Sequence, residues 1–212
     1  MEKLLLIGGG GHCNSIIDSL MSQSHRYEQI GIIDREERLG QYVHGIPVIG
    51  VDDDLPVLYE QGYNNAFISL GSVGNPINRI QIYRKIKKIG YKIPNIIDET
   101  AIVSKNTKIG DGVFIGKRAI VNIGVSVGDN TIINSGAIIE HDCEIGSFVH
   151  LAPGCIVCGG DKVGDNTHIG ANATIIQGIE IGKNTIIGAG TVVIKDIKSE
   201  CTIIGNPGRK LR

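Results

Sequence analysis

The chain has few aromatic residues and no tryptophan: its 212 residues include six Tyr and three Phe. Branched aliphatic residues are abundant instead, with 39 Ile, 15 Val and 10 Leu, and 30 residues are Gly. Because β-branched side chains favour strands and glycine weakens helices, this composition disfavours a helical bundle. We expect an aliphatic core and a fold rich in β-structure.

An excess of positive charge is also lacking, since 21 Lys and Arg residues are balanced by 22 Asp and Glu residues. Proteins that bind nucleic acid or anionic membranes usually carry a clustered surplus of basic residues. We therefore expect neither nucleic acid nor a membrane surface as a partner.

Long apolar runs are absent near the start of the chain, where Leu4 to Ile7 is too short for a signal peptide or a membrane span. The five cysteines are an odd number in a chain large enough to build its own core, so we expect reduced thiols and a cytoplasmic protein. Cys155 and Cys158 form a single Cys-x-x-Cys pair with no second pair to complete a site, and no metal is expected.

Residues 1–95 alternate short apolar runs with helical patterns and are predicted to form a first domain. Leu4 to Ile7 leads into four glycines, Gly8 to Gly11, followed by an amphipathic helix beginning near Asn14. Apolar runs at 29–34 and 66–71 are typical of buried parallel strands, and a second helical pattern follows Asn75-Pro76. This order predicts a small α/β domain with a doubly wound, Rossmann-like parallel sheet.

In residues 96–212 a branched aliphatic residue recurs at every sixth position, from Ile97 to Val193 without a break. The residue that directly follows these aliphatics from Ile109 onward is most often Gly, with Asn at 122 and 134, which we interpret as corners with positive φ. Three such units make one turn of a triangular coil. The second domain is therefore predicted to be a parallel β-helix of hexapeptide repeats, in which positions i and i+18 stack about 4.8 Å apart.

The repeat is interrupted where Glu140, His141 and Asp142 occupy a corner. One coil further on, the stacked positions are Gly159 and Gly160, so no side chain lies directly above the imidazole. An imidazole suits the deprotonation of an amine or hydroxyl that attacks a thioester, and Asp142 can accept a hydrogen bond from its other ring nitrogen. The backbone N–H groups of the two glycines are candidates to stabilise the oxyanion.

The repeat resembles that of the hexapeptide-repeat acyltransferases, whose fold is a left-handed parallel β-helix. Within them, segment 139–146 (IEHDCEIG) resembles the catalytic segment of the sialic acid O-acetyltransferases and nucleotide-linked 4-amino-sugar N-acetyltransferases of bacterial glycan pathways. These enzymes also join a Rossmann-like N-terminal domain to the β-helix. The resemblance implies acetyl-CoA as co-substrate, a homotrimer with active sites between subunits, His141 as catalytic base, and Asp142 as the acid that raises its basicity.

The resemblance also implies binding residues, position by position. The residues implied to contact acetyl-CoA are His150, Gly159, Ala171 and Ala189. The residues implied to contact the nucleotide-linked sugar are Gly10, Gly11, His12, Asp34, Arg35 and Gly71. The glycine loop has Cys13 where the dinucleotide fingerprint ends in glycine, which disfavours NAD, although a glycine loop that opens a helix suits phosphate.

These features favour acetyl-CoA-dependent N-acetylation of the 4-amino group of a nucleotide-linked amino-deoxysugar. O-acetylation of a sialic or related nonulosonic acid stays open, with Asp142 and His150 favouring the amine. A non-catalytic β-helix scaffold stays open too, although it would not require the interruption at 140–142. A zinc hydratase of this fold needs three convergent histidines, usually including a pair five residues apart, and it is disfavoured because the spacings among His141, His150 and His168 are 9 and 18 residues.

Overall fold

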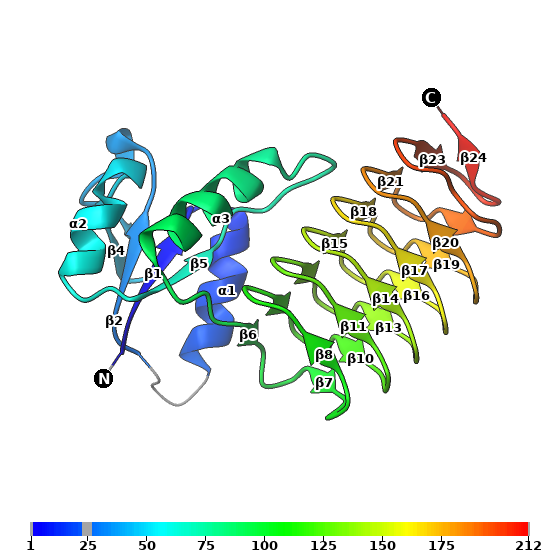
Figure 1. Ribbon diagram of the computed structural model, residues 1–212, viewed down its shortest axis with the longest axis horizontal. Coiled ribbons are helices and arrows are strands. Elements are labelled where there is room, and N and C mark those ends of the chain that lie inside the picture. The colour runs from blue at the N-terminus through cyan, green and yellow to red at the C-terminus, as the bar shows by residue number, and fades with distance from the viewer. Residues whose placement is uncertain (1, 23–26, 212) are drawn as a thin grey trace. The chain divides into compact units, whose positions relative to one another are not determined.

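The computed structural model describes residues 2–22 and 27–211 (Figure 1). The chain divides into two compact units, one formed by Met1–Gly71 and Ile77–Ile96 and the other by Ser72–Pro76 and Ile97–Arg212. Each unit has its own cluster of buried apolar side chains. None of the helices in the described ranges is long and apolar enough to cross a membrane.

The first unit contains a five-stranded sheet of order β3-β4-β2-β1-β5. Its strands are β1 (Glu2–Ile7), β2 (Tyr27–Ile33), β3 (Tyr42–Val43), β4 (Ile46–Gly50) and β5 (Asn65–Ile68). Its helices are α1 (Gly11–Met21), α2 (Leu55–Glu60) and α3 (Ile77–Ile89), with the short 3-10 helices η1 (Glu36–Arg38) and η2 (Asp52–Asp54). Strands β4, β2, β1 and β5 are parallel neighbours, which confirms the predicted parallel core of the sheet.

Two details of this unit differ from the sequence-based expectation. Strands β3 and β4 form an antiparallel hairpin, so the sheet is mixed; its two-residue turn is His44-Gly45, with φ values of 46° and 82°. Such a turn requires two residues with positive φ, which glycine supplies readily. Helix α1 begins at Gly11 rather than near Asn14, because the glycine loop continues directly into the helix with Gly10 as its N-cap.

The second unit is a three-sided parallel β-helix whose sides are sheets of mostly two-residue strands (Figure 1). In these strands the first residue points outward and the second inward. We name each side by its outward residues. The apolar face comprises β7 (Ile102–Val103), β10 (Ile120–Val121), β13 (Ile138–Ile139), β16 (Ile156–Val157), β19 (Thr174–Ile175) and β22 (Val192–Val193).

The charged face comprises β8 (Lys108–Ile109), β11 (Ser126–Val127), β14 (Glu144–Ile145), β17 (Lys162–Val163) and β20 (Glu180–Ile181). The histidine face comprises β6 (Ile96–Ile97), β9 (Phe114–Ile115), β12 (Ile132–Ile133), β15 (His150–Leu151), β18 (His168–Ile169), β21 (Ile186–Ile187), β23 (Thr202–Ile204) and β24 (Arg209–Lys210). Strand β24 closes this sheet by pairing antiparallel with β23.

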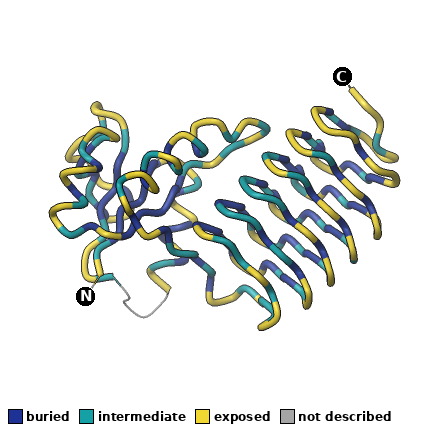
Figure 2. Tube along the Cα trace, viewed as in Figure 1, coloured by how far each residue is buried: buried dark blue, intermediate teal, exposed yellow. Residues whose placement is uncertain are grey.

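Stacking at i+18 is confirmed by the strand register. Val121 pairs with Ile139, Ile139 with Val157, and His150 with His168. The repeating aliphatics point inward, and most are fully buried, as the dark strands of Figure 2 show. The six-residue period of aliphatics therefore identifies the side chains that stack in columns inside the coil.

The corners obey a different rule from the one expected. Positive φ occurs at the third residue after each inward aliphatic from Ile109 to Ile187, as at Asp142 (60°) and Gly160 (75°), not at the first. The glycine directly after the aliphatic is required by close stacking: a Cβ on Gly128 would lie 2.6 Å from backbone atoms of the next coil, and one on Gly164 would lie 2.5 Å from them. Our assignment of positive φ to these glycines was wrong, although the coil it supported is correct.

Candidate active site

His141 and Asp142 lie at the corner between β13 and β14, where the apolar face meets the charged face. Nδ1 of His141 lies 3.0 Å from Oδ2 of Asp142, and the two side chains are 60% and 72% exposed. Because an ionised carboxylate only accepts hydrogen bonds, Nδ1 carries the proton and Nε2 is left with a lone pair. The short arm of Asp142 therefore reaches the imidazole, and Nε2 is available to take up a proton.

Glycines provide the space around this pair. A Cβ on Gly159 would lie 2.6 Å from Nε2 of His141, and one on Gly124, directly below Asp142, would collide with its carboxylate. The N–H of Gly160 donates to the carbonyl of His141 at 2.9 Å, so it is not available to an oxyanion, contrary to expectation. The N–H of Gly159 makes no hydrogen bond to any residue of the described ranges and remains the candidate donor.

Glu140, the third residue of the interruption, is held away from the imidazole. Its Oε2 accepts a hydrogen bond from Nδ2 of Asn122, one coil below, at 2.9 Å. Cys158 lies one coil above Glu140, and burial, together with the nearby carboxylates, raises the pKa of its thiol. Burial raises the pKa of Cys155 to about 12, so both members of the Cys-x-x-Cys pair are protonated thiols. Among residues 2–22 and 27–211 no three His, Cys, Asp or Glu side chains are placed to hold a metal ion.

Asp161 is a buried carboxyl group two residues beyond Gly159. Its Oδ1 accepts a hydrogen bond from the N–H of Ile179, the residue stacked one coil above it, at 2.8 Å. The hydroxyl of Thr131 makes the same kind of bond, accepting from the N–H of Val149 one coil above it at 3.2 Å. The hydroxyl of Thr131 also donates to a carbonyl, at 2.8 Å, which an ionised carboxylate cannot do. Oδ2 of Asp161 is buried without a partner in the described structure. Burial accordingly raises the pKa of Asp161 to about 6, despite the backbone N–H groups that stabilise its anion.

His150 lies on the histidine face, away from His141 in the same chain. Its Nδ1 donates to the carbonyl of Ser72 at 2.6 Å, and Nδ2 of Asn134 lies 3.3 Å from its Nε2. Its ring stacks edge-to-face on that of His168, with centroids 4.9 Å apart, and burial lowers the pKa of His168. Both ring nitrogens of His150 thus have protein partners.

The remaining residues implied for acetyl-CoA are split between two corners. Gly159 stacks above His141, whereas Ala171 and Ala189 follow β18 and β21, at the corner between the histidine and apolar faces. The two alanines are one coil apart and occupy one column. Within one chain, the structure therefore brings Gly159 to His141 and leaves the alanines on the opposite edge of the apolar face.

In the first unit, Asp34 anchors the glycine loop. Its Oδ2 accepts from the N–H of Gly9 at 3.1 Å and from Nη1 of Arg38 at 2.5 Å, and the same nitrogen donates to the carbonyl of Gly9 at 2.9 Å. Arg38 was not among the expected residues, although its i+4 spacing from Asp34 is a signal for such a pair. A Cβ on Gly10 or Gly11 would meet nothing within 4 Å, so space is open before the N-terminus of α1.

Gly71 and His12 lie together, since a Cβ on Gly71 would lie 3.3 Å from Cβ of His12. They follow β5 and begin α1, respectively. Arg35 directly follows Asp34, and both line a cavity at the carboxyl ends of the strands. The six residues implied for the sugar nucleotide thus lie beyond the carboxyl ends of β1, β2 and β5, in loops or in the first turn of α1, which is where open α/β sheets bind ligands.

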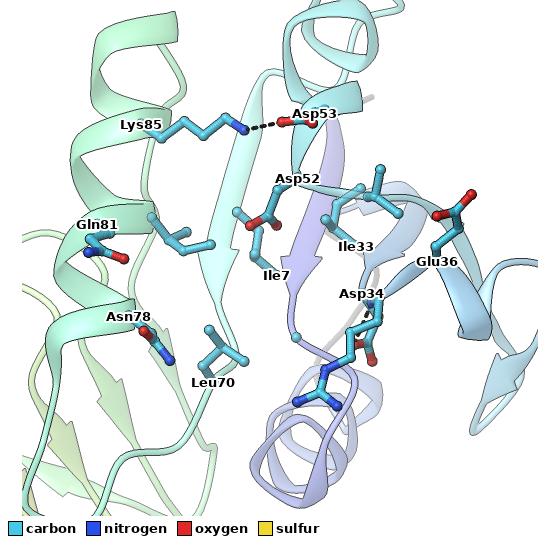
Figure 3. A pocket seen from close by; sticks show the side chains of 14 residues that line it. Ile7, Ile33, Asp34, Glu36, Asp52, Asp53, Leu70, Asn78, Gln81 and Lys85 are labelled. Carbon is cyan, nitrogen blue, oxygen red and sulfur yellow. Dashed lines mark hydrogen bonds and ion pairs between the residues drawn. The ribbon is translucent and has the colours of Figure 1, made fainter.

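This cavity has a volume of about 680 Å³ (Figure 3). Its apolar lining consists of Ile7, Ile33, Val51, Leu70 and Ile82. Its other side chains include Asp52, Asn78, Gln81 and Lys85, and Lys85 forms an ion pair with Asp53 at 3.0 Å. Sequence reasoning missed this second set of polar residues. Three consecutive acids at 52–54, directly after the end of β4, were the available signal.

Comparisons with known proteins match both units. The family model of the PglD N-terminal domain matches residues 3–86, and that of the bacterial transferase hexapeptide (six repeats) matches 106–141, 124–159 and 162–195. A comparison with curated protein sequences finds no match.

Solved structures match the whole chain. Perosamine N-acetyltransferase from Caulobacter crescentus, an H141N mutant in complex with CoA and GDP-perosamine, is 33% identical with a TM-score of 0.92, over 100% of this chain and 98% of that one. The acetyltransferase domain of PglB from Neisseria gonorrhoeae, in complex with acetyl coenzyme A, is 32% identical with a TM-score of 0.91, over 99% of each chain. WeeI from Acinetobacter baumannii, at 24% identity and a TM-score of 0.88 over 100% of each chain, is similar in fold.

Proposed function

We propose that this chain N-acetylates a nucleotide-linked amino sugar. It belongs to the hexapeptide-repeat acetyltransferases that join a PglD N-terminal domain to a left-handed parallel β-helix. The acetyl donor is acetyl-CoA, and the acceptor is the 4-amino group of an amino-deoxysugar. The observation that carries this proposal is the His141–Asp142 pair, in which Nε2 of His141 faces the open space at Gly159. The similar enzymes were solved with CoA and GDP-perosamine, or with acetyl coenzyme A, which supports both substrates.

His141 acts as the general base of this reaction. The amine nitrogen attacks the thioester carbonyl, and Nε2 takes the proton that the nitrogen loses as the N–C bond forms. Asp142 accepts from Nδ1–H and stabilises the resulting imidazolium. When the C–S bond breaks, the CoA sulfur leaves as a thiolate and the proton on Nε2 is available to it. The N–H of Gly159 is the proposed donor to the oxyanion.

A homotrimer is part of the proposal because the residues implied for acetyl-CoA do not meet in one chain. His150, Gly159, Ala171 and Ala189 are proposed contacts of acetyl-CoA, with the alanines acting through their backbone. The apolar face lies between the alanine corner and the His141 corner, and its outward row includes Ile102, which is 65% exposed. Packing this face between copies buries the row and brings the alanine corner of one subunit to the His141 corner of another.

The first unit holds the nucleotide-linked sugar in this proposal. Gly10 and Gly11 leave the N-terminus of α1 open for a phosphate, which helix N–H groups bind well. Asp34 fixes the loop through Gly9, so its contribution to binding is in part indirect. His12, Arg35 and Gly71 complete the proposed substrate contacts. We place the enzyme in the cytoplasm, and its five free cysteines, four of them buried, support a reducing compartment.

Thiol release from acetyl-CoA tests the proposal. The purified protein is given UDP-, GDP- and dTDP-linked 4-amino sugars and, separately, free sialic acid, and the acetylated product is identified by mass spectrometry. Amide formation on one of the nucleotide-linked amino sugars is expected. Turnover with sialic acid alone would replace the proposal with O-acetylation, and turnover with none would contradict an acetyltransferase of either kind.

A further inference from the structure

The cavity of the first unit contains features that distinguish one nucleobase from another. It lies at the carboxyl ends of β1, β2 and β4, beside Gly8 of the glycine loop. A nucleotide whose phosphates meet the N-terminus of α1 therefore has this cavity within reach of its base. The aliphatic side chains of Ile7, Ile33 and Leu70 offer flat apolar walls, which suit any base and select none. Selection must come from the polar side chains.

The four acidic side chains at the cavity differ in the hydrogen bonds and ion pairs that they make within the protein. Asp34 is hydrogen-bonded to Gly9 and Arg38, and Asp53 is paired with Lys85. Glu36 lies on η1, and Figure 3 shows it on the far side of Ile33 from α3. Asp52 makes no hydrogen bond or ion pair to any residue in the described part of the chain. Its side chain is exposed at the edge of the cavity, and partial burial raises its pKa against the opposing effect of Lys85.

Figure 3 shows Asp52 between the strand ends that carry Ile7 and Ile33 and the helix α3, which carries Asn78 and Lys85. The carboxylate thus lines the cavity, with apolar side chains of the strand ends on one side and the polar side chains of α3 on the other. A base lying in the cavity must present its edge to a group that only accepts hydrogen bonds. Leaving such a group without a donor when the ligand excludes water is costly.

The bases differ in what they offer to a carboxylate. Guanine presents two adjacent donors, N1–H and the 2-amino group, which match the two oxygens of a carboxylate. Uracil and thymine present one N–H between two carbonyl oxygens, so a carboxylate would face like partial charges. Adenine and cytosine present an amino group beside a ring nitrogen that accepts. The carbonyl O6 of guanine also needs a donor, and Asn78 and Lys85, which line the same cavity, both carry N–H groups.

We infer that Asp52 selects guanine, so that the nucleotide-linked substrate of this chain is a GDP-sugar. This inference rests on the proposed function, since it concerns the base of the same substrate. Asp52 is a specificity-determining residue in this view, and it takes no part in acetyl transfer.

Isothermal titration calorimetry with GDP, UDP and dTDP tests the inference on the intact protein and on Asp52→Asn. A well-formed bidentate pair discriminates between bases by about 10- to 100-fold, so we expect the wild type to bind GDP at least about 10-fold more tightly than UDP or dTDP. Asp52→Asn is expected to lose about 10- to 100-fold in GDP affinity. It should leave UDP and dTDP affinity unchanged or higher, because the amide offers a donor to their carbonyl oxygens. Glu37→Gln, which removes the same charge from an exposed residue outside the cavity, is expected to keep the wild-type preference.

A wild type that binds UDP or dTDP as tightly as GDP would overturn the inference. An equal loss for all three nucleotides in Asp52→Asn would overturn it too, because it would place the carboxylate on the shared ribose or diphosphate. Acetyl transfer to a UDP- or dTDP-sugar and not to a GDP-sugar would also reject guanine while leaving the proposed function intact. GDP-selective binding without transfer to any amino sugar would support guanine selection and contradict the proposed function. Binding of no nucleotide would contradict both guanine selection and the proposed function.

Discussion

Replacing Gly159 by alanine should disable catalysis while leaving the fold intact. The new Cβ would lie 2.6 Å from Nε2, 2.7 Å from Cε1 and 3.2 Å from Cδ2 of His141. Carbon and nitrogen atoms in van der Waals contact stay roughly 3.5 Å apart, so the ring must retreat by about 1 Å or rotate away. A misplacement of about 1 Å costs on the order of 100-fold in rate, and we expect kcat to fall by about that factor.

The stability of this variant should barely change. The backbone of Gly159 is not in the left-handed region, and the group it would touch is the end of a side chain that is 60% exposed and free to swing outward. Alanine also restricts the unfolded chain, which stabilises by about 0.4–1 kcal/mol at a compatible site. The assay combines steady-state kinetics, CoA binding by calorimetry and thermal melting. A kcat within about threefold of the wild type, or a fall in Tm of many degrees, would refute this reasoning.

Three further predictions concern the pair at the corner, the buried carboxyl and the apolar face. Asp142→Asn replaces a carboxylate that only accepts with an uncharged amide that can also donate to Nδ1, so the His141 tautomer is no longer fixed and the imidazolium loses its counter-charge; we expect kcat to fall by about 10- to 100-fold with the melting temperature unchanged, and an unaltered kcat would exclude Asp142 from catalysis. Asp161 has a pKa of about 6 in the fold against 3.8 as its ordinary value, so it stabilises the protein when protonated and loses that contribution as the pH rises from about 4 to about 6. Asp161→Thr, which introduces the hydroxyl pattern of Thr131, should therefore gain up to about 2 kcal/mol in unfolding free energy, relative to the wild type, between pH 4.5 and pH 7.5; a constant difference in urea titrations at the two pH values would contradict this. Ile138→Lys on the apolar face should yield inactive monomers in light scattering, whereas Glu144→Lys on the charged face should leave the trimer and its activity; an active wild-type monomer would refute the trimer.

Much of the fold could be predicted because the β-helix repeats one constraint many times. Every inward column needs a branched aliphatic at a fixed interval, so the period from Ile97 to Val193 identifies the coil and its register. The corner rule was misread because two different constraints both favour glycine. One is left-handed φ, as at Gly160, and the other is close stacking between coils, as at Gly128. Composition alone does not distinguish them.

The candidate site was predictable where a repeat was broken and harder to predict elsewhere. His141 and Asp142 stand out because they interrupt a strict pattern, and moving one coil onward from His141 finds Gly159. Arg38 and Asp52 interrupt no pattern, since charged residues are ordinary after a strand end. Their roles depend on which loops the sheet brings together, and that follows from the strand order rather than from local sequence.

Acetyl transfer by His141→Ala tests whether His141 is the general base. The measurement is kcat for thiol release with acetyl-CoA and the preferred nucleotide-linked amino sugar, made on a variant whose oligomeric state is confirmed by light scattering. General-base catalysis by a positioned side chain contributes about 100- to 10,000-fold, so we expect a loss of at least about 100-fold with the trimer intact. An intact trimer that turns over at the wild-type rate would contradict general-base catalysis by His141.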